Sequence, residues 1–155
     1  MNNQLFRHGI LVAAVLAISL PVLAACASGP AATSAPSYTV TTMNKAGIGD
    51  YLVDGKGMTL YYFTRDTAGK SSATAQVIAN WPIFYAADIV IPSNLNTSDF
   101  GSITGFNGQA QTTYKGWPLY YYIKDQTPGD TLGQGVGGVW YVINPQSVPL
   151  PASGS

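Results

Sequence analysis

Two stretches of the chain share one pattern of aromatic and aliphatic residues. Residues 56–66 read KGMTLYYFTRD and residues 115–125 read KGWPLYYYIKD, so six of eleven positions are identical at a constant offset of 59. In each copy a glycine precedes apolar residues on both alternating sets of positions, which is typical of a strand that is covered on both faces. The pattern predicts a duplicated supersecondary unit and a pseudo-twofold domain rather than a solenoid.

The alternation within each copy predicts which residues share a face of the strand, because successive side chains of a strand point to opposite sides. One face is expected to carry Met58, Leu60 and Tyr62 in the first copy, and Trp117, Leu119 and Tyr121 in the second. The other face is expected to carry Tyr61 and Phe63 in the first copy, and Tyr120 and Tyr122 in the second.

An aspartate closes each copy, Asp66 in the first and Asp125 in the second, and turn-forming residues follow it. Two interpretations of these aspartates stay open. The carboxylate either accepts backbone N–H groups and closes the turn, or it takes part in a binding or catalytic site.

Four other short segments have the alternation or the β-branched and aromatic content of strands. They cover residues 38–43, 51–53, 111–114 and 139–143. Residues 74–80 form the one helix candidate, which is short and stops before a Trp-Pro pair.

Glycine, asparagine, serine and threonine dominate residues 92–109 and 126–138, so loops are predicted there. Asp54-Gly-Lys-Gly57 lacks the alternating oxygen ligands of a calcium loop and predicts a hairpin turn instead. Together these patterns predict an all-β domain over residues 38–145 with at most one short helix. Two related hairpin-containing repeats would form a sandwich or a small barrel.

The N-terminus has the pattern of a signal peptide over residues 1–25, with Arg7 ahead of the apolar run at residues 10–20. This run is shorter than the about 20 apolar residues that a transmembrane helix needs. Leu-Ala-Ala before Cys26 resembles the bacterial lipobox, which implies that the cysteine is joined to diacylglycerol and becomes the first residue of the mature chain. The alternative is an ordinary cleavage site next to a free or buried thiol.

Small residues and proline follow the cysteine, so residues 26–37 are predicted to be a lipid-bearing cysteine and a flexible spacer. Residues 146–155 are predicted to be a frayed tail. The membrane is therefore the expected partner, with the domain held at the cell membrane or the outer membrane and facing the periplasm or the exterior. By analogy with lipoprotein sorting, Ala27 favours the outer membrane if the cell has two.

The composition argues against several classes of partner, catalytic site and metal site. Charged residues make up 9% of the chain against about 25% in ordinary proteins, which argues against a nucleic-acid partner. The single histidine, His8, lies in the signal peptide, and all seven acidic residues are aspartates. The mature domain thus lacks the imidazole of a Ser-His-Asp or Cys-His unit and the ligands of a zinc or copper site. No cofactor and no metal are expected.

The duplicated motif supports a family resemblance. The chain resembles the predicted lipoproteins defined by a Tyr-x-[Phe/Trp/Tyr]-x-x-Asp motif, also called the secreted repeat of unknown function, over most of residues 47–145. The motif residues are Tyr61, Phe63 and Asp66 in the first copy, and Tyr120, Tyr122 and Asp125 in the second. The resemblance implies an envelope lipoprotein with two repeats and implies no activity.

The chain departs from the family at one place. Many members carry two cysteines just before the Trp-Pro pair, where this chain has Ala73 and Val77. A disulfide at that place is absent here, so a redox role is not expected and stability is left to aromatic packing.

Three functions are compatible with the sequence. The first is a non-enzymatic structural or binding module of the cell envelope, whose partner is another envelope protein or a glycan. The second is an aromatic platform near Trp81, Trp117 or Trp140 that binds a glycan or another small flat ligand. The third is an enzyme that uses a pair among the motif aspartates and Asp130 with a nearby tyrosine, which requires two carboxylates about 5–10 Å apart in one cleft.

Overall fold

The computed structural model describes residues 37–147. The predicted signal peptide, Cys26, nearly all of the spacer at 26–37 and most of the tail at 146–155 lie outside these residues. The predictions made for them are therefore not tested by the structure. No helix within the described range is long and apolar enough to cross a membrane.

Strands dominate the described part of the chain, and one short α-helix lies among them. In chain order the elements are β1 (Val40–Lys45), β2 (Gly49–Asp54), β3 (Tyr61–Phe63), α1 (Ala75–Asn80), η1 (Thr97–Asp99), β4 (Phe100–Thr104), η2 (Phe106–Gly108), β5 (Ala110–Tyr114), β6 (Trp117–Pro118), η3 (Val136–Gly138) and β7 (Trp140–Val142). The predicted all-β class and the single helix at 74–80 are confirmed. Thr74 is the N-cap residue of α1, and the N–H of Trp81 closes its last turn on the Val77 carbonyl.

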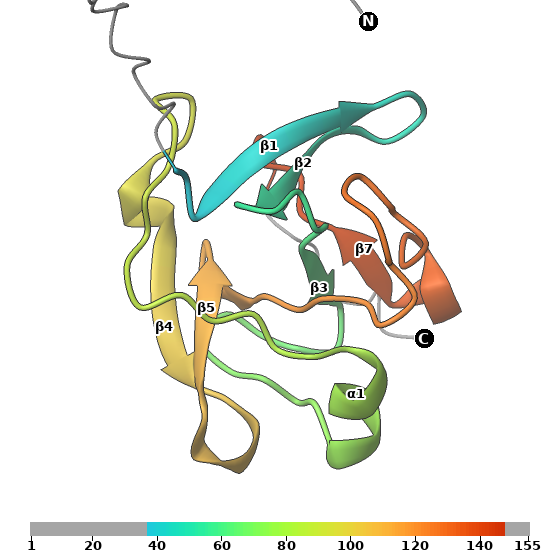
Figure 1. Ribbon diagram of the computed structural model, residues 1–155. Helices are drawn as coiled ribbons and strands as arrows, with labels where there is room; N and C mark the ends of the chain where they lie inside the picture. Colours follow the sequence, from blue (N-terminus) through green and yellow to red (C-terminus); the bar gives the residue numbers. More distant parts are fainter. Residues whose placement is uncertain (1–36, 148–155) are drawn as a thin grey trace, which may run out of the picture. The chain divides into compact units, whose positions relative to one another are not determined.

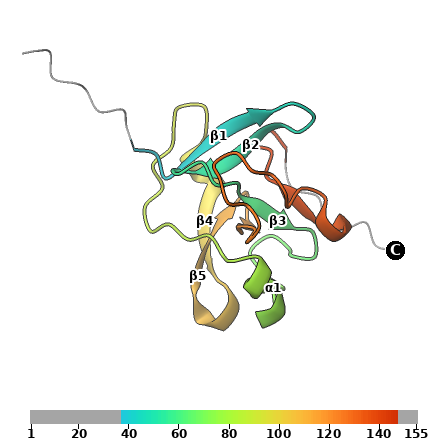
Figure 2. The same cartoon turned by 45° about the vertical axis from the view of Figure 1, so that its right-hand side comes forward.

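The strands form three small antiparallel sheets (Figure 1): β1 with β2, β3 with β7, and β4, β5 and β6 together. Among residues 37–147 no sheet closes on itself, so the small barrel offered as one form of the fold is wrong. The strands are two to six residues long, and turns with left-handed glycines interrupt them, which leaves too little continuous pairing for closure. Figures 1 and 2 place the β1–β2 hairpin and α1 at opposite ends of the domain.

The turn after β2 is the predicted hairpin turn. Val53 pairs with Thr59 in an antiparallel bridge, and the Gly57 N–H donates to the Asp54 carbonyl at 2.9 Å. Gly57 has a φ of 85°, a conformation that glycine adopts without steric cost. One carboxylate oxygen of Asp54 also accepts the N–H groups of Lys56 and Met58 at 2.8 and 2.9 Å, so the side chain closes this turn.

The prediction of loops over residues 92–109 is wrong for Phe100–Thr104, which form β4. This strand pairs with β5 from Phe100 opposite Tyr114 to Thr104 opposite Ala110. Its glycine and serine have low strand propensity, but β4 is an exposed edge strand whose backbone pairing with β5 decides the conformation. Local composition therefore predicted a loop at β4, where pairing with β5 stabilises a strand.

Two hydrophobic clusters correspond to the two predicted strand faces. The first cluster contains Tyr51, Val53, Tyr61, Phe63, Trp81, Tyr120, Trp140 and Val142. The second cluster contains Val40, Leu52, Leu60, Phe84, Tyr114, Leu119 and Ile143. Adjacent residues of the motif strands thus enter different clusters, which confirms that both faces are covered. Ala73 and Val77 pack against the first cluster as partly buried apolar residues.

Gly133 lets the loop after β6 approach the first cluster closely. A Cβ atom at this position would lie 2.8 Å from both the Trp81 and the Tyr61 ring. Neither buried ring can move away easily, because each is packed among other aromatic rings. The position therefore tolerates no side chain.

We expect Gly133→Ala to lower the free energy of unfolding by about 1–3 kcal/mol, the usual cost of overpacking a core. Chemical denaturation followed by tryptophan fluorescence measures the change. Gly101→Ala is the control, since its nearest contact is the Thr113 hydroxyl at 3.1 Å on an edge strand. Equal stabilities of the two variants would contradict the packing described for Gly133.

Candidate functional site

The two copies of the motif meet at Tyr61 and Tyr120. Each of these residues donates its backbone N–H to the carbonyl of the other, and both distances are 2.9 Å. The two residues are equivalent under the sequence offset of 59. This reciprocal pair therefore lies where the pseudo-twofold relation brings the two repeats together.

The tyrosine side chains of the motif cross between the repeats. The Tyr61 hydroxyl donates to the Asp125 Oδ2 atom at 2.7 Å, and the Tyr120 hydroxyl donates to the Asp66 Oδ2 atom at 2.7 Å. Each tyrosine is thus bonded to the aspartate of the other copy. We call these two hydrogen bonds the cross-repeat pairs.

The second oxygen of each motif carboxylate is bonded within its own repeat. The Asp66 Oδ1 atom accepts the backbone N–H and the hydroxyl of Ser72 at 2.7 and 2.9 Å. The Asp125 Oδ1 atom accepts the Leu132 N–H at 3.0 Å. Both aspartates are buried, with 1% and 6% of their surface exposed. Each carboxylate therefore joins the loop after its own strand to the tyrosine of the other strand.

Further donors and acceptors complete the environment of the two tyrosine hydroxyls. The Gly133 N–H donates to the Tyr61 hydroxyl at 3.2 Å, and the Ser71 hydroxyl lies 2.7 Å from the Tyr120 hydroxyl. Each motif tyrosine hydroxyl thus has a second hydrogen-bond partner besides its aspartate, a backbone N–H for Tyr61 and a serine hydroxyl for Tyr120.

Burial controls the ionisation of the cross-repeat pairs. Removal from water raises the pKa of Asp66 and of Asp125 above the usual value, against the lowering effect of their hydrogen bonds. Burial also raises the pKa of Tyr61 and Tyr120 well above about 10, and the adjacent carboxylates add to this effect. The phenols therefore remain protonated and act as hydrogen-bond donors at neutral pH.

A third tyrosine–aspartate pair also joins the repeats. The Tyr121 hydroxyl donates to the Asp54 Oδ2 atom at 2.9 Å, which connects the second motif strand to the first hairpin turn. By contrast, Asp130 accepts the N–H groups of Thr127 and Gln126 at 2.9 Å, and these hydrogen bonds lower its pKa. Asp130 thus holds its own turn, and no tyrosine hydroxyl bonds to it in the described part of the chain.

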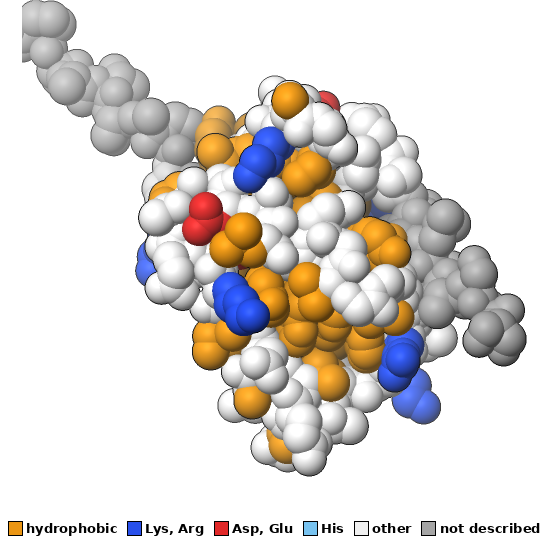
Figure 3. Space-filling view, turned by 90° about the vertical axis from the view of Figure 1, so that its right-hand side faces the viewer, with side chains coloured by type: hydrophobic (Ala, Val, Ile, Leu, Met, Phe, Trp, Pro, Cys, Tyr) orange, Lys and Arg blue, Asp and Glu red, His pale blue; other side chains and the backbone are white. Residues whose placement is uncertain are grey.

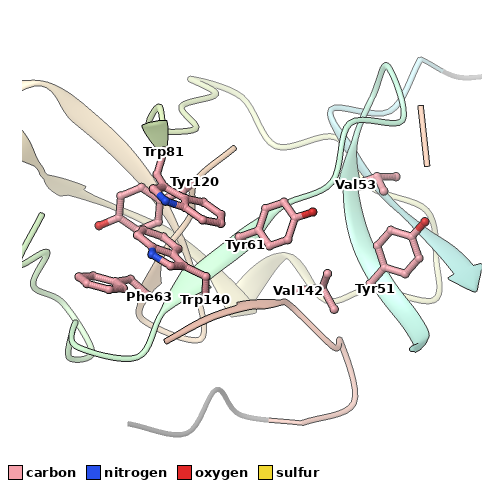
Figure 4. Packing of buried hydrophobic residues seen from close by; sticks show 8 residues of the cluster. All are labelled: Tyr51, Val53, Tyr61, Phe63, Trp81, Tyr120, Trp140 and Val142. Atoms are coloured by element: carbon pink, nitrogen blue, oxygen red, sulfur yellow. The ribbon is translucent and has the colours of Figure 1, made fainter. Parts of the chain in front are cut away.

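Four aromatic rings form a continuous stack beside the cross-repeat pairs. Phe63 stacks on Trp140 with ring centroids 4.3 Å apart, Trp140 on Trp81 at 3.8 Å, and Trp81 on Tyr122 at 4.1 Å. The offset of 59 exchanges Phe63 with Tyr122 and Trp81 with Trp140, so the stack obeys the same pseudo-twofold relation. Figure 4 shows the two indoles lying parallel next to Phe63.

The motif tyrosines contact the stack by their edges. Tyr61 meets Trp81 at 5.4 Å and Tyr120 meets Trp140 at 5.2 Å, both in a T-shaped arrangement. Pairs of this kind add about 0.5–1.5 kcal/mol each beyond the burial of their area. The stack and the cross-repeat pairs thus form one connected aromatic and polar centre.

A groove of about 340 Å³ opens next to the stack, between α1 and the segment that leads into β7. Trp81 and Trp140 lie along it although only 5% and 4% of their surface is exposed, and the half-buried Tyr122 lies beside them. The face shown in Figure 3 carries a broad area of hydrophobic side chains with lysine and arginine at its margin. A larger hollow of about 640 Å³ lies elsewhere, next to Asp99 and Lys115, and contains no motif residue.

All six motif residues named from the sequence lie in this centre: Tyr61, Phe63, Asp66, Tyr120, Tyr122 and Asp125. The sequence named Trp81 and Trp140 separately but did not pair them with each other, although they also differ by 59 in number. Extending the repeat comparison beyond residues 56–66 and 115–125 finds this pair. Within 37–147, no three aspartates, cysteines or histidines gather as metal ligands do.

The comparison with known families fits this geometry. The chain matches a family described as a secreted repeat of unknown function, once over residues 42–84 and once over residues 101–144. The chain belongs to this family. The two matched segments contain the two motif copies and together cover more than half of the chain, which confirms the resemblance and the duplication. The family is named for lipoproteins and is secreted, which implies an extracytoplasmic location.

Comparison with curated proteins gave no match, and comparison with solved structures gave none either.

The cross-repeat pairs make a thermodynamic prediction. Tyr61→Phe removes a donor from the buried Asp125 carboxylate and should lower the free energy of unfolding by about 1–3 kcal/mol. A double-mutant cycle with Asp125→Asn should give a coupling energy of at least about 0.5 kcal/mol, because the two side chains are in contact. Tyr85→Phe, at a half-exposed tyrosine, is the neutral control. A larger coupling of Tyr61 to Asp66 than to Asp125 would contradict the crossed arrangement.

Stability should also depend on pH in the alkaline range. Burial raises the pKa of Tyr114 to about 12 and raises the pKa of Tyr61, Tyr120 and Tyr121 as well. The unfolded chain ionises its tyrosines near pH of about 10. The stabilisation from the neutral phenols is therefore complete below that pH and is lost as the pH rises through the folded-state values.

Urea unfolding at a series of pH values, together with a phenolate absorbance titration, tests this dependence. The free energy of unfolding should fall steadily above pH of about 10. Free energies that stay level through that range, while every tyrosine ionises in the folded protein, would contradict it.

Proposed function

We propose that the protein is a lipid-anchored module of the cell envelope that acts by binding or by supporting other envelope components, without catalysing a reaction. The anchor is Cys26, whose Leu-Ala-Ala context has the form of a lipobox. The anchored domain faces the periplasm or the exterior from the cell membrane or the outer membrane. The extracytoplasmic location of the family supports this placement.

The main support for this proposal is that the carboxylates of the motif aspartates are fully hydrogen-bonded within the protein. Both oxygens of Asp66 and both oxygens of Asp125 accept hydrogen bonds from the protein. A glycosidase-like reaction needs one carboxyl group that donates a proton to substrate and a second that attacks or activates water. Carboxylates already engaged by the fold are poorly suited to either task, whereas they are well suited to holding two repeats together.

The aromatic-platform alternative receives less support. Glycans stack on the open face of a ring, but the facing sides of Trp81 and Trp140 are covered by each other and by the neighbouring rings. Trp117 is also buried and meets Tyr62 edge to face. Trp81 and Trp140 therefore offer only a small exposed area, 5% and 4% of their surface, to a ligand.

Changing Cys26 to alanine tests the anchor. We expect Cys26→Ala to abolish incorporation of labelled fatty acid and to leave an unprocessed precursor, because the thiol is the proposed site of acylation. Metabolic labelling followed by immunoprecipitation measures both effects. Cys26 is the only cysteine of the chain, so the control is the wild-type protein labelled in parallel. Labelled, processed protein from the variant would contradict the anchor.

The enzymatic alternative makes a different prediction for cells that carry variants of the motif residues. A carboxylate that acts chemically predicts loss of cellular function in Asp66→Asn at unchanged melting temperature. The present proposal predicts that function and melting temperature fall together, and that Tyr120→Phe behaves in the same way because it breaks the same hydrogen bond.

A further inference from the structure

The groove beside the aromatic stack combines polar donors with an apolar wall. Trp81 and Trp140 line it, and Lys124 lines it as well. None of the aspartates of the described chain lines the groove, so Lys124 is its only charged side chain. The one charged side chain on the groove is therefore a cation, which attracts an anion.

The fold does not use the hydrogen-bond donors of these three side chains. Within residues 37–147, neither indole N–H nor the Lys124 ammonium forms a hydrogen bond or an ion pair with another residue. Neither indole nitrogen belongs to the buried polar atoms that lack a partner, which are only Thr64 Oγ1 and Gln111 Oε1 in the described part. Both indole nitrogens therefore reach solvent, and they do so from rings that are otherwise buried.

The rigidity of these donors favours recognition. Trp81 and Trp140 are held parallel at 3.8 Å with an interplanar angle of 3°, so their N–H groups lose little freedom when a ligand binds. Val77 and Val136 supply the apolar wall, together with the half-buried Tyr122. A volume of about 340 Å³ lies within the range of small-molecule sites.

We propose that this groove binds a small monocarboxylate carried on an apolar ring, with Lys124 and the indole N–H groups of Trp81 and Trp140 as donors to the carboxylate. One cation matches a single negative charge better than it matches a phosphate dianion. The valine side chains contact the ring of the ligand. This inference rests on the proposed function only in that the protein acts by binding, since the groove lies within the folded domain and not at the anchor.

Benzoate is the probe, and benzamide is its neutral counterpart of almost the same shape. The test uses the full-length mature protein in detergent micelles, with the indole N–H resonances followed by NMR. We expect saturable shifts of the Trp81 and Trp140 resonances with benzoate and about tenfold weaker binding of benzamide. The Trp117 resonance is an internal control, because Trp117 does not line the groove.

Two variants assign the site. Lys124→Gln should weaken benzoate binding about tenfold, and Lys70→Gln, an exposed lysine that does not line the groove, should leave it unchanged. Val136→Phe should fill the groove and abolish binding while the melting temperature stays near that of the wild type. Val136→Phe tests the site independently of Lys124→Gln, because it reduces the volume of the groove and removes none of the proposed donors.

Several outcomes would overturn the proposal. They are equal binding of benzoate and benzamide, undiminished binding by Lys124→Gln or Val136→Phe, and the absence of saturable shifts at any soluble concentration of benzoate. Tighter binding of glucuronate than of benzoate would overturn the apolar ring and favour a hydroxylated one. A failed Cys26→Ala experiment leaves each of these results unaffected, so the two proposals fail independently.

Discussion

The hydrogen bond from each motif tyrosine to the aspartate of the other repeat is the interaction on which the domain depends. A buried carboxylate without a partner costs several kilocalories per mole, and one that is fully bonded stabilises the fold. Asp66 has its loop partner in its own repeat but its phenol partner in the other, and Asp125 is arranged in the same way. Neither repeat satisfies its own buried polar groups, so the two halves fold as one unit.

This crossing gives the Tyr-x-aromatic-x-x-Asp motif a physical explanation. The tyrosine and the aromatic residue two positions later share one strand face, which brings Tyr61 to the opposite repeat and Phe63 to the end of the stack. The aspartate, five positions after the tyrosine, follows the strand and receives the phenol of the other copy. The motif therefore connects the two repeats, and Trp81, Tyr122 and Trp140 of the same aromatic centre line the groove beside it.

The sequence predicted the repeat, the two strand faces, the helix and the turn at Asp54, because each leaves a local pattern of period, glycine placement or chain reversal. The crossed partners could not be predicted in the same way. A repeat states that Tyr61 and Tyr120 are equivalent, but not whether each bonds the aspartate of its own copy or of the other. β4 was missed for a related reason, since its pairing with β5 is a tertiary property that a serine- and glycine-containing segment does not reveal.

Carboxyl carbon NMR of the two motif aspartates tests the crossed arrangement most directly. Each aspartate should titrate above the usual pH range, because burial raises the pKa of both. Tyr61→Phe should shift the carboxyl resonance and the titration of Asp125 and leave those of Asp66 nearly unchanged, and Tyr120→Phe should do the reverse. A response of Asp66 to Tyr61→Phe, with Asp125 unaffected, would show that each repeat bonds its own aspartate and would contradict the account.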